Sequence, residues 1–306
     1  MSLRKTYQQI KNLKIQGATA VAVAVIKELR AEGLKPTAGD YFEWWQNLFK
    51  ASSFLLTSRP TEPMAQNLSR LLLATLQQAN EVKSGQRLLR QSADDILNLI
   101  KLGQENIIRS GQKLIKNGDY IFTHCHSSTV ERILVDAQKD GKKIKVFNTE
   151  TRPLFQGRIT AKNLLKQGID VTMVADSAAG FLIAEESGKD ILMDKVLIGA
   201  DVVISNGAAI NKIGSFNIAL AAAANNVPVY IVAHLLKTDD DGIVYIEKRA
   251  DREIWPSAPK KLKILNFAFD LVPAHYITGL VTEFGILTPA EVKKVVKQNY
   301  PWLLRK

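Results

Sequence analysis

The chain has 306 residues, 46% of them hydrophobic, a mean hydropathy of −0.04 and a formal charge of +11, which is enough chain for a well-buried core and two domains. No apolar run approaches the ~20 residues of a membrane helix, the first residues lack the apolar core of a signal peptide, and a single cysteine excludes an internal disulfide. We therefore expect a soluble, cytoplasmic protein whose positive charge attracts phosphates, although no RNA- or DNA-binding signature accompanies that charge.

The first part of the chain predicts helices, because apolar residues recur there at three- and four-residue spacing. Ser92, followed by two aspartates, suits the start of the last helix, and Gly118 suits its end. The alternating VAVAV run at 21–25 resembles a strand, but its alanines and its helical neighbours favour a helix. We expect a helical N-terminal domain over residues 1–117. Its helices are predicted at 19–33, 40–58, 63–82 and 92–118.

Beyond residue 118 the pattern changes to short β-branched runs separated by helical stretches. This alternation predicts an α/β domain over residues 118–306, with a parallel sheet covered by helices on both faces. Its strands are predicted at 120–124, 143–150, 170–176, 195–201, 227–233 and 277–283. In such sheets ligands bind beyond the carboxyl ends of the strands. The polar residues expected at those ends are His124, Cys125, Glu150, Arg152, Asp176 and Asp201.

Three interpretations are open for Cys125, which lies between His124 and His126. A metal site is disfavoured, because adjacent residues of a strand point to opposite faces and the other two histidines show no ligand spacing. A buried, inert thiol with a purely structural role is the second interpretation. The third interpretation is an acid–base thiol: Ser127 and Ser128 suit a helix start, and the helix dipole together with nearby cations would lower the thiol pKa. The same helix terminus and the Ser127 hydroxyl could hold a phosphate.

Asp201 ends the apolar run KVLIGAD and is followed by VVISNGAAINKIGS. A lone aspartate after a strand is often only a cap, but this run carries further signals. Asn206 and Gly207 mark a tight turn, and Asn211 with Lys212 supplies an amide and a cation at the next junction between strand and loop. The sequence therefore predicts a second chemically active strand end beside that of Cys125.

The segments THCHS, TETRPLFQG, DSAAGFLI, GADVVISNGAAINKIGS and FAFDLVP…YITGLVTEFGILTP resemble one superfamily. It contains the regulatory subunits of translation initiation factor 2B, methylthioribose-1-phosphate isomerase and archaeal-type ribose-1,5-bisphosphate isomerase. The resemblance covers nearly the whole chain and implies a helical domain followed by a Rossmann-like domain. It also implies assembly through the Rossmann-like domain, and the apolar segment 265–287 fits a homodimer or a hexamer built from dimers.

The isomerases of this superfamily carry a cysteine and an aspartate where this chain has Cys125 and Asp201, and the regulatory subunits commonly lack that pair. HCHS and SNGAAINKIG look more like ribose-1,5-bisphosphate isomerase. The resemblance thus implies an aldose–ketose isomerase that converts ribose 1,5-bisphosphate to ribulose 1,5-bisphosphate through an enol phosphate, without a metal or an organic cofactor. Asp201, protonated through burial, would be the acid at the ring oxygen, and the Cys125 thiolate would take the C2 proton.

The resemblance also assigns residues to the two phosphates. Arg59, before Pro60, would present a forked donor, and glycine at position 17 would let the backbone approach a phosphate closely. From the residues alone, Arg59 could equally be a helix-end ion pair and Lys237 a solvated loop charge. Together with Ser127 from the helix start, the predicted substrate-binding residues are Gln16, Gly17, Ala18, Arg59, Gln156, Asn211, Lys212 and Lys237.

This chain departs from the family pattern at four places. Gln16 stands where the isomerases usually have arginine, Val272 lacks a hydroxyl, His275 replaces a carboxylate, and 185–191 is an extra segment. Such changes could alter the substrate, weaken its binding or abolish isomerisation. The main alternative is a non-catalytic regulatory subunit that binds a nucleotide or a sugar phosphate. A methylthioribose-1-phosphate isomerase-like activity and activation by a nucleotide also stay open.

Overall fold

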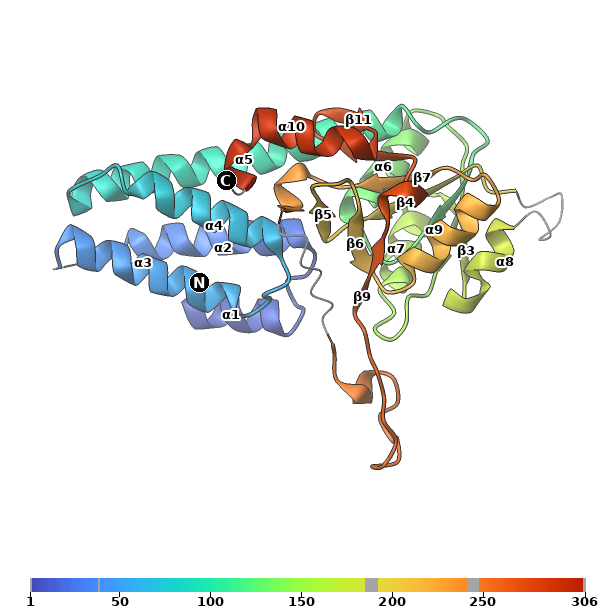
Figure 1. Ribbon diagram of the computed structural model, residues 1–306, viewed down its shortest axis with the longest axis horizontal. Coiled ribbons are helices and arrows are strands. Elements are labelled where there is room, and N and C mark those ends of the chain that lie inside the picture. The colour runs from blue at the N-terminus through green and yellow to red at the C-terminus, as the bar shows by residue number, and fades with distance from the viewer. Residues whose placement is uncertain (1, 38, 185–191, 241–247, 305–306) are drawn as a thin grey trace.

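The computed structural model describes residues 2–37, 39–184, 192–240 and 248–304, so the extra segment 185–191 lies outside the described residues. The N-terminal part is helical (Figure 1). Its helices are α1 (Leu3–Lys11), α2 (Ala18–Gly33), α3 (Tyr41–Leu56), α4 (Pro63–Leu76) and α5 (Val82–Gln112). The VAVAV run lies within α2, where Val21, Val25 and Leu29 are buried at helical spacing. The prediction of a helix there is confirmed.

Three helix boundaries were predicted wrongly: α5 ends at Gln112 and not at Gly118, and the other two lie at the junction of α4 and α5. Helix α1 was not predicted. Helix α4 ends at Leu76, and α5 begins at Val82, so Ser92 lies inside a helix and does not start one. The first turns of α5 are held by tertiary packing around Gly85. A Cβ at that glycine would lie 2.7 Å from the Trp44 ring, so the glycine is what lets α5 pack closely on α3.

The C-terminal part is built on a seven-stranded sheet with the strand order β11-β10-β7-β4-β1-β2-β3. Neighbouring strands are parallel except β10 and β11. The strands are β1 (Tyr120–Thr123), β2 (Lys145–Thr149), β3 (Asp170–Val174), β4 (Lys195–Gly199), β7 (Val229–Val232), β10 (Gly279–Thr282) and β11 (Gly285–Leu287). The six predicted strands are confirmed, and β11 was not predicted.

Helices cover both faces of this sheet, as the alternation predicted. On one face, Ile121 of β1 packs in a core with Ile107 of α5 and residues of α6 and α7. On the other face, Phe122 packs in the core that holds Ile218 of α9 and residues of α8. The helices of this part are α6 (Ser128–Lys139), α7 (Gly157–Lys166), α8 (Ala179–Ile183), α9 (Ser215–Ala224) and α10 (Val292–Asn299). Helix α5 therefore contributes to the cores of both parts of the molecule, because its Leu89 packs among the N-terminal helices.

A second, four-stranded sheet was missed by the sequence reading. Its order is β8-β5-β6-β9, with β5 (Val202–Ile204), β6 (Ala209–Lys212), β8 (Thr238–Asp239) and β9 (Phe269–Val272). The predicted tight turn joins β5 to the antiparallel β6: Gly207 has φ 87°, and the Ala208 N–H donates to Asn206 Oδ1 at 3.0 Å. This hairpin follows Asp201 directly and places Asn211 and Lys212 at its far end.

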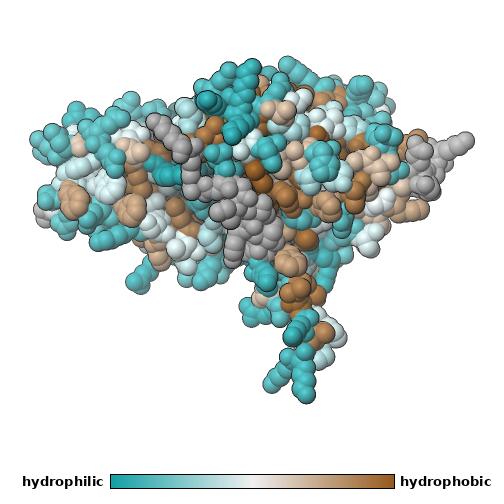
Figure 2. Space-filling model, in the orientation of Figure 1, coloured by the Kyte–Doolittle hydropathy of each residue, from teal (hydrophilic) through white to brown (hydrophobic). Residues whose placement is uncertain are grey.

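Residues 248–268 form an arm that projects from the body before β9 (Figure 1). The arm carries exposed apolar side chains, among them Trp255 (46% exposed) and Leu265 (67% exposed). Apolar surface is visible where the arm leaves the body (Figure 2). In the part of the chain that the structure describes, no helix combines the length and apolarity needed to cross a membrane.

Candidate active site

A cavity of ≈ 270 Å³ lies where the N-terminal helices meet the carboxyl ends of the sheet strands. All eleven residues predicted for catalysis or substrate binding line it, although they come from separate stretches of the chain. They are Gln16, Gly17, Ala18, Arg59, Cys125, Ser127, Gln156, Asp201, Asn211, Lys212 and Lys237. The structure thus brings the predicted residues together, and their chemical roles stay predictions.

The backbone of Cys125 is held in a left-handed conformation, with φ 65°. Its N–H donates to Thr151 Oγ1 at 3.0 Å, and its carbonyl accepts from Thr160 Oγ1 at 2.9 Å. His126 Nδ1 in turn lies 3.1 Å from Thr160 Oγ1. A non-glycine residue adopts this conformation only where its surroundings fix it, and two side-chain hydroxyls do so here.

A buried chain of hydrogen bonds continues from Thr151 to His124. The contact between His124 and Ile213 fixes which atoms of this chain donate. His124 Nε2 lies 2.8 Å from the Ile213 carbonyl, and because a carbonyl can only accept, Nε2 carries the proton. Burial lowers the pKa of His124 to about 4, which leaves Nδ1 free to accept from Thr149 Oγ1 at 2.5 Å. Thr149 then accepts from Thr151 Oγ1 at 3.1 Å. Both nitrogens of His124 are occupied, which removes this residue from any metal site.

The pKa of the Cys125 thiol is raised, contrary to the expected low pKa. Burial raises the pKa of Cys125 to about 11, although Lys212 and Arg59 act in the lowering direction. Asp201 also raises it, because a carboxylate beside the thiol disfavours a second negative charge. The helix dipole and the cations are visible in the sequence, whereas the desolvation of the thiol depends on the residues that pack around it in the fold.

Asp201 follows β4, and its N–H donates to the Ile210 carbonyl at 2.9 Å, which fixes it against the β5–β6 hairpin. Beside it, Lys237 Nζ donates to the Ala200 carbonyl at 2.6 Å. Lys237 is therefore not the solvated loop charge that the sequence alone allowed. Burial lowers the pKa of Lys237, while the carboxylates of Asp201, Glu62 and Glu283 act in the raising direction.

Arg59 lies in the loop between α3 and α4 and contacts Glu62, the N-cap residue of α4, at 3.1 Å. The predicted alternatives, a helix-end ion pair and a cavity residue, both hold, because the guanidinium also lines the cavity. The Glu62 carboxylate is buried, so it holds Arg59 in one place within the cavity wall.

The N-termini of two long helices add partial positive charge to the cavity. The first turn of α2 lines it through Ala18, Thr19 and Ala20, and the Gly17 N-cap supplies no side-chain acceptor for the free N–H groups. Gly17 has φ 85° and open space around its Cβ position, so the glycine is explained by its conformation and not by a close approach. At α6, the Ser127 hydroxyl accepts from the Val130 N–H at 3.4 Å, a long capping bond.

Several lining residues were not predicted from the sequence. The most important is Arg249, at the base of the arm, which contacts Glu253 at 2.6 Å and supplies a further cation. Its only signal was a run of mixed charges, EKRADRE, which is typical of a solvated surface. The other missed residues are Leu13, Thr19, Ala20, His126, Ser128, Thr129, Leu154, Gly199, Ala200, Ala268 and Phe269.

Two of the departures from the family pattern lie outside the cavity lining. Val272 is fully buried at the end of β9, and His275 lies in the short helix Ala274–Tyr276 with its ring 4.1 Å from that of Tyr276. Gln16, by contrast, lies on the cavity wall directly before α2. Among the described residues, no group of three or more histidine, cysteine, aspartate or glutamate side chains is arranged to hold a metal ion.

Comparison with known proteins agrees with the fold and with the resemblance. The model of the initiation factor 2 subunit family matches residues 14–289. The chain is 36% identical over 307 residues to a ribose 1,5-bisphosphate isomerase of Methanocaldococcus jannaschii, covering 98% of this chain and 96% of the relative. It is 32% identical to a methylthioribose-1-phosphate isomerase of Heliobacterium modesticaldum, covering 92% and 86% of the two chains.

Among solved structures, the 5-methylthioribose 1-phosphate isomerase from Pyrococcus horikoshii OT3 superimposes with a TM-score of 0.80. The two proteins are 26% identical, and the match covers 98% of this chain and 88% of the other. The mixed α/β architecture, with its helical N-terminal part and parallel sheet, is therefore shared with a known isomerase.

Proposed function

Because the chain belongs to the initiation factor 2 subunit family, we propose that it is a sugar-phosphate isomerase of the aldose–ketose type, and that its substrate is ribose 1,5-bisphosphate. One observation carries the proposal: a thiol and a carboxylate, Cys125 and Asp201, line one cavity whose other charged residues, among those described, are all cationic. A regulatory binding site needs the cations, whereas it has no use for the thiol–carboxylate pair.

The charge of the cavity supports a bisphosphate over a monophosphate. Each phosphate ester carries a charge of about −2 near neutral pH, so a sugar bisphosphate brings about −4. The cavity offers the side chains of Arg59, Lys212, Lys237 and Arg249, together with the free N–H groups of α2. A methylthioribose 1-phosphate carries one phosphate ester, so it brings about −2 and would engage fewer of these donors.

In the proposed reaction, Asp201 as the acid protonates the ring oxygen and opens the ring, and Cys125 as thiolate removes the C2 proton. The product of these steps is the enol phosphate, with a double bond between C1 and C2 and a hydroxyl on C2. Cys125 then returns a proton to C1, and the C2 hydroxyl returns one to Asp201, which yields ribulose 1,5-bisphosphate. Both groups end in their starting states, so no net proton is consumed.

The raised pKa of Cys125 is compatible with this cycle. A thiol beside a carboxylate holds the same number of protons as a thiolate beside a carboxylic acid. The reactive form therefore requires a proton to move from Sγ to the carboxylate within the cavity, and not to be lost to solvent. This move also removes the charge of Asp201, which is one of the two causes that raise the pKa of Cys125.

The test is incubation with ribose 1,5-bisphosphate and, separately, with methylthioribose 1-phosphate, followed by ³¹P and ¹H NMR. We expect signals of ribulose 1,5-bisphosphate and little turnover of the monophosphate. Reaction in D2O should place deuterium at C1, because the Cys125 proton exchanges with solvent while the enol phosphate exists. Turnover of the monophosphate alone would reassign the substrate, and binding of either sugar without turnover would favour the regulatory role.

A further inference from the structure

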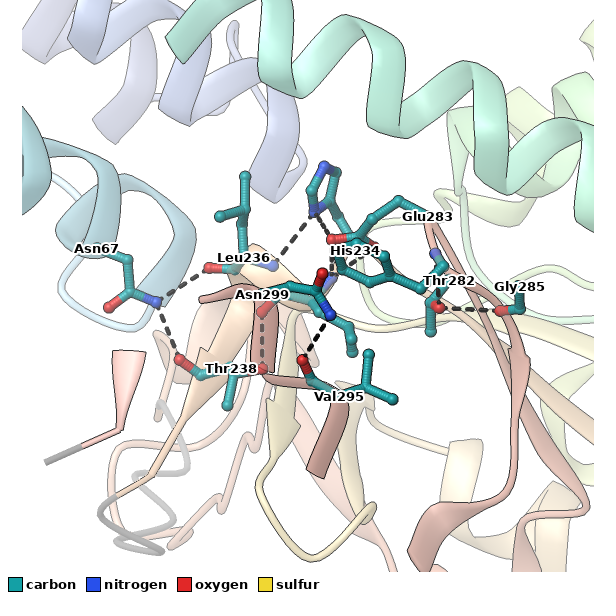
Figure 3. Close-up of polar contacts among 11 residues, drawn as sticks. Asn67, His234, Leu236, Thr238, Thr282, Glu283, Gly285, Val295 and Asn299 are labelled. Carbon is teal, nitrogen blue, oxygen red and sulfur yellow. Dashed lines mark hydrogen bonds and ion pairs between the residues drawn. The ribbon is translucent and has the colours of Figure 1, made fainter. Parts of the chain in front are cut away.

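A buried carboxylate, that of Glu283, lies against the segment that carries Lys237 into the cavity (Figure 3). Glu283 directly follows β10, and both of its carboxylate oxygens accept from the Leu235 N–H, at 3.1 and 3.0 Å. His234 Nδ1 lies 2.7 Å from the same carboxylate and accepts from the Leu236 N–H at 3.2 Å, and the Tyr300 hydroxyl also hydrogen-bonds to Glu283. Leu235 is the first residue of a one-turn helix, Leu235–Lys237, so the carboxylate fixes the start of that turn.

The opposite end of this turn is fixed from the N-terminal helices. Asn67 of α4 donates through Nδ2 to the carbonyls of Leu236 and Thr238, at 3.0 and 2.9 Å (Figure 3). The turn is therefore clamped between α4 and the end of β10. The clamp is buried throughout, because Asn67, His234 and Glu283 are all less than a tenth exposed.

We propose that Glu283 is a positioning residue for Lys237: its carboxylate fixes the start of the turn that carries Lys237, Asn67 fixes the other end, and the buried negative charge of Glu283 adds to the surroundings of the ammonium beside Asp201. The inference rests on the proposed function in one respect, namely that Lys237 contacts a phosphate of the substrate. Glu283 itself is not among the residues that line the cavity.

The charges around Lys237 determine in which direction its pKa should change when the Glu283 charge is removed. Burial works against its charge, and three carboxylates from different elements oppose that effect: Asp201 after β4, Glu62 at the start of α4, and Glu283 after β10. The cations Arg59, Lys212 and Arg249 line the same cavity and disfavour a further positive charge. Removal of the Glu283 charge should therefore lower the pKa of Lys237, so that the ammonium is lost at a lower pH.

The experiment compares the wild type with Glu283→Gln, which keeps the shape and an acceptor for Leu235 but removes the charge. Sulfate is the probe, because its own charge is constant between about pH 7 and pH 10. At each pH, the rise in melting temperature caused by sulfate is measured within each variant, which cancels the effect of the substitution on stability itself. We expect the alkaline loss of sulfate stabilisation to occur at a lower pH in Glu283→Gln than in the wild type.

Three further variants separate the charge effect from a general loss of structure. Glu291→Gln removes an exposed carboxylate from the same C-terminal segment, in the capping box with Thr288. It should leave the alkaline limb, that is, the pH range over which sulfate stabilisation is lost, unchanged. Tyr300→Phe removes one donor to Glu283 but keeps its charge, so its limb should stay close to that of the wild type. In a Lys237→Met background, Glu283→Gln should no longer shift the limb, which the double variant tests against Lys237→Met alone.

An unchanged alkaline limb in folded Glu283→Gln overturns the proposal, and so does a shift that persists in the Lys237→Met background. If Glu283→Gln does not fold, Glu283→Asp withdraws the charge by one methylene and should give a smaller shift in the same direction; no shift overturns the proposal equally. Sulfate binding requires no isomerase activity. A protein that shows the Lys237-dependent shift but does not isomerise ribose 1,5-bisphosphate would refute the proposed function and leave this inference standing.

Discussion

The imidazole of His124 donates its Nε2–H to the carbonyl of Ile213 at 2.8 Å, and Ile213 directly follows Lys212. One ring therefore joins the Cys125 loop to the loop that presents a cation to the same cavity. Since His124 is buried and neutral, its other nitrogen depends on the hydroxyl of Thr149.

Substitution of Thr149 tests this chain of hydrogen bonds. Thr149→Val keeps the volume but leaves His124 Nδ1 and the Thr151 hydroxyl without their partner, which should cost about 1–3 kcal/mol of unfolding free energy. Thr149→Ser keeps the hydroxyl and is the matched control, with a much smaller loss. Urea unfolding measures both. Equal stability of the Val and Ser variants would show that the hydroxyl is not part of the chain.

The proposed acid–base pair predicts a separation of binding from turnover. Cys125→Ser and Asp201→Asn should each lower kcat by several orders of magnitude, since each removes a proton-transfer group. Both variants should still bind ribose 1,5-bisphosphate, because the cations and the α2 N-terminus hold the phosphates. Isothermal titration and the NMR assay measure the two quantities. Turnover close to that of the wild type in either variant would contradict the assignment.

The pKa of Cys125 predicts how the free thiol reacts. With a pKa of about 11, about one thiol in a thousand is a thiolate at pH 8 in the unliganded protein. Alkylation by iodoacetamide should therefore be far slower than for a free cysteine, and its rate should rise about tenfold per pH unit up to about pH 11. A rate that levels off near neutral pH would show that the thiolate is already stable there.

Gln16 predicts a gain of affinity on substitution. It lies on the cavity wall before the uncapped N-terminus of α2, so a guanidinium at this position would face the same anion as the α2 N–H groups. Gln16→Arg should add a charge-assisted pair, and about 1.5–3 kcal/mol corresponds to roughly ten- to a hundredfold tighter binding of the sugar bisphosphate. If calorimetry shows no gain, or if the wild type prefers a nucleotide, the regulatory role would gain support.

Self-association is the fifth prediction. We expect a homodimer or a hexamer built from dimers at micromolar concentration, because Leu265 and Trp255 on the arm expose apolar side chains that a monomer would leave in water. Leu265→Asp should weaken the assembly, whereas Glu291→Gln, an exposed polar change elsewhere, should not. Light scattering measures the mass. A monomeric wild type would refute the prediction.

Six strands of the first sheet could be predicted from local signals in the sequence. Local signals also marked Cys125 and Asp201 as strand-end residues, whereas Arg59 and Lys237 were assigned to the cavity through the family resemblance. The β-branched runs have strand length, and residues such as Cys125 and Asp201 stand directly after them. The second sheet was missed because β5 spans only Val202–Ile204, too short to show a period. Arg249 was missed because a run of charged residues is expected at the surface. Its place in the cavity lining depends on how the arm folds.

The prediction of the thiol pKa failed for a different physical reason. The signals visible in the sequence, a helix start and nearby cations, both lower it, and both are present in the structure. Desolvation is not a property of any segment, because it arises when residues of α2, the Arg59 loop and the loop after β1 come together around one cavity. The sign of the shift is therefore decided by packing between parts of the chain that are far apart in sequence, as Arg59 and Cys125 are.

The continuity of α5 bears on how a ligand can enter and leave. This helix has 31 residues and is about 46 Å long, and it contributes Leu89 to one core and Ile107 to another. One continuous helix thus packs in both cores, and a rotation of the N-terminal helices away from the sheet would require α5 to bend or break. We therefore expect ligand entry and release to depend on small local displacements and not on a hinged opening of the two parts. The loop before α2 and the base of the arm at Arg249 line the cavity and are the segments that could move.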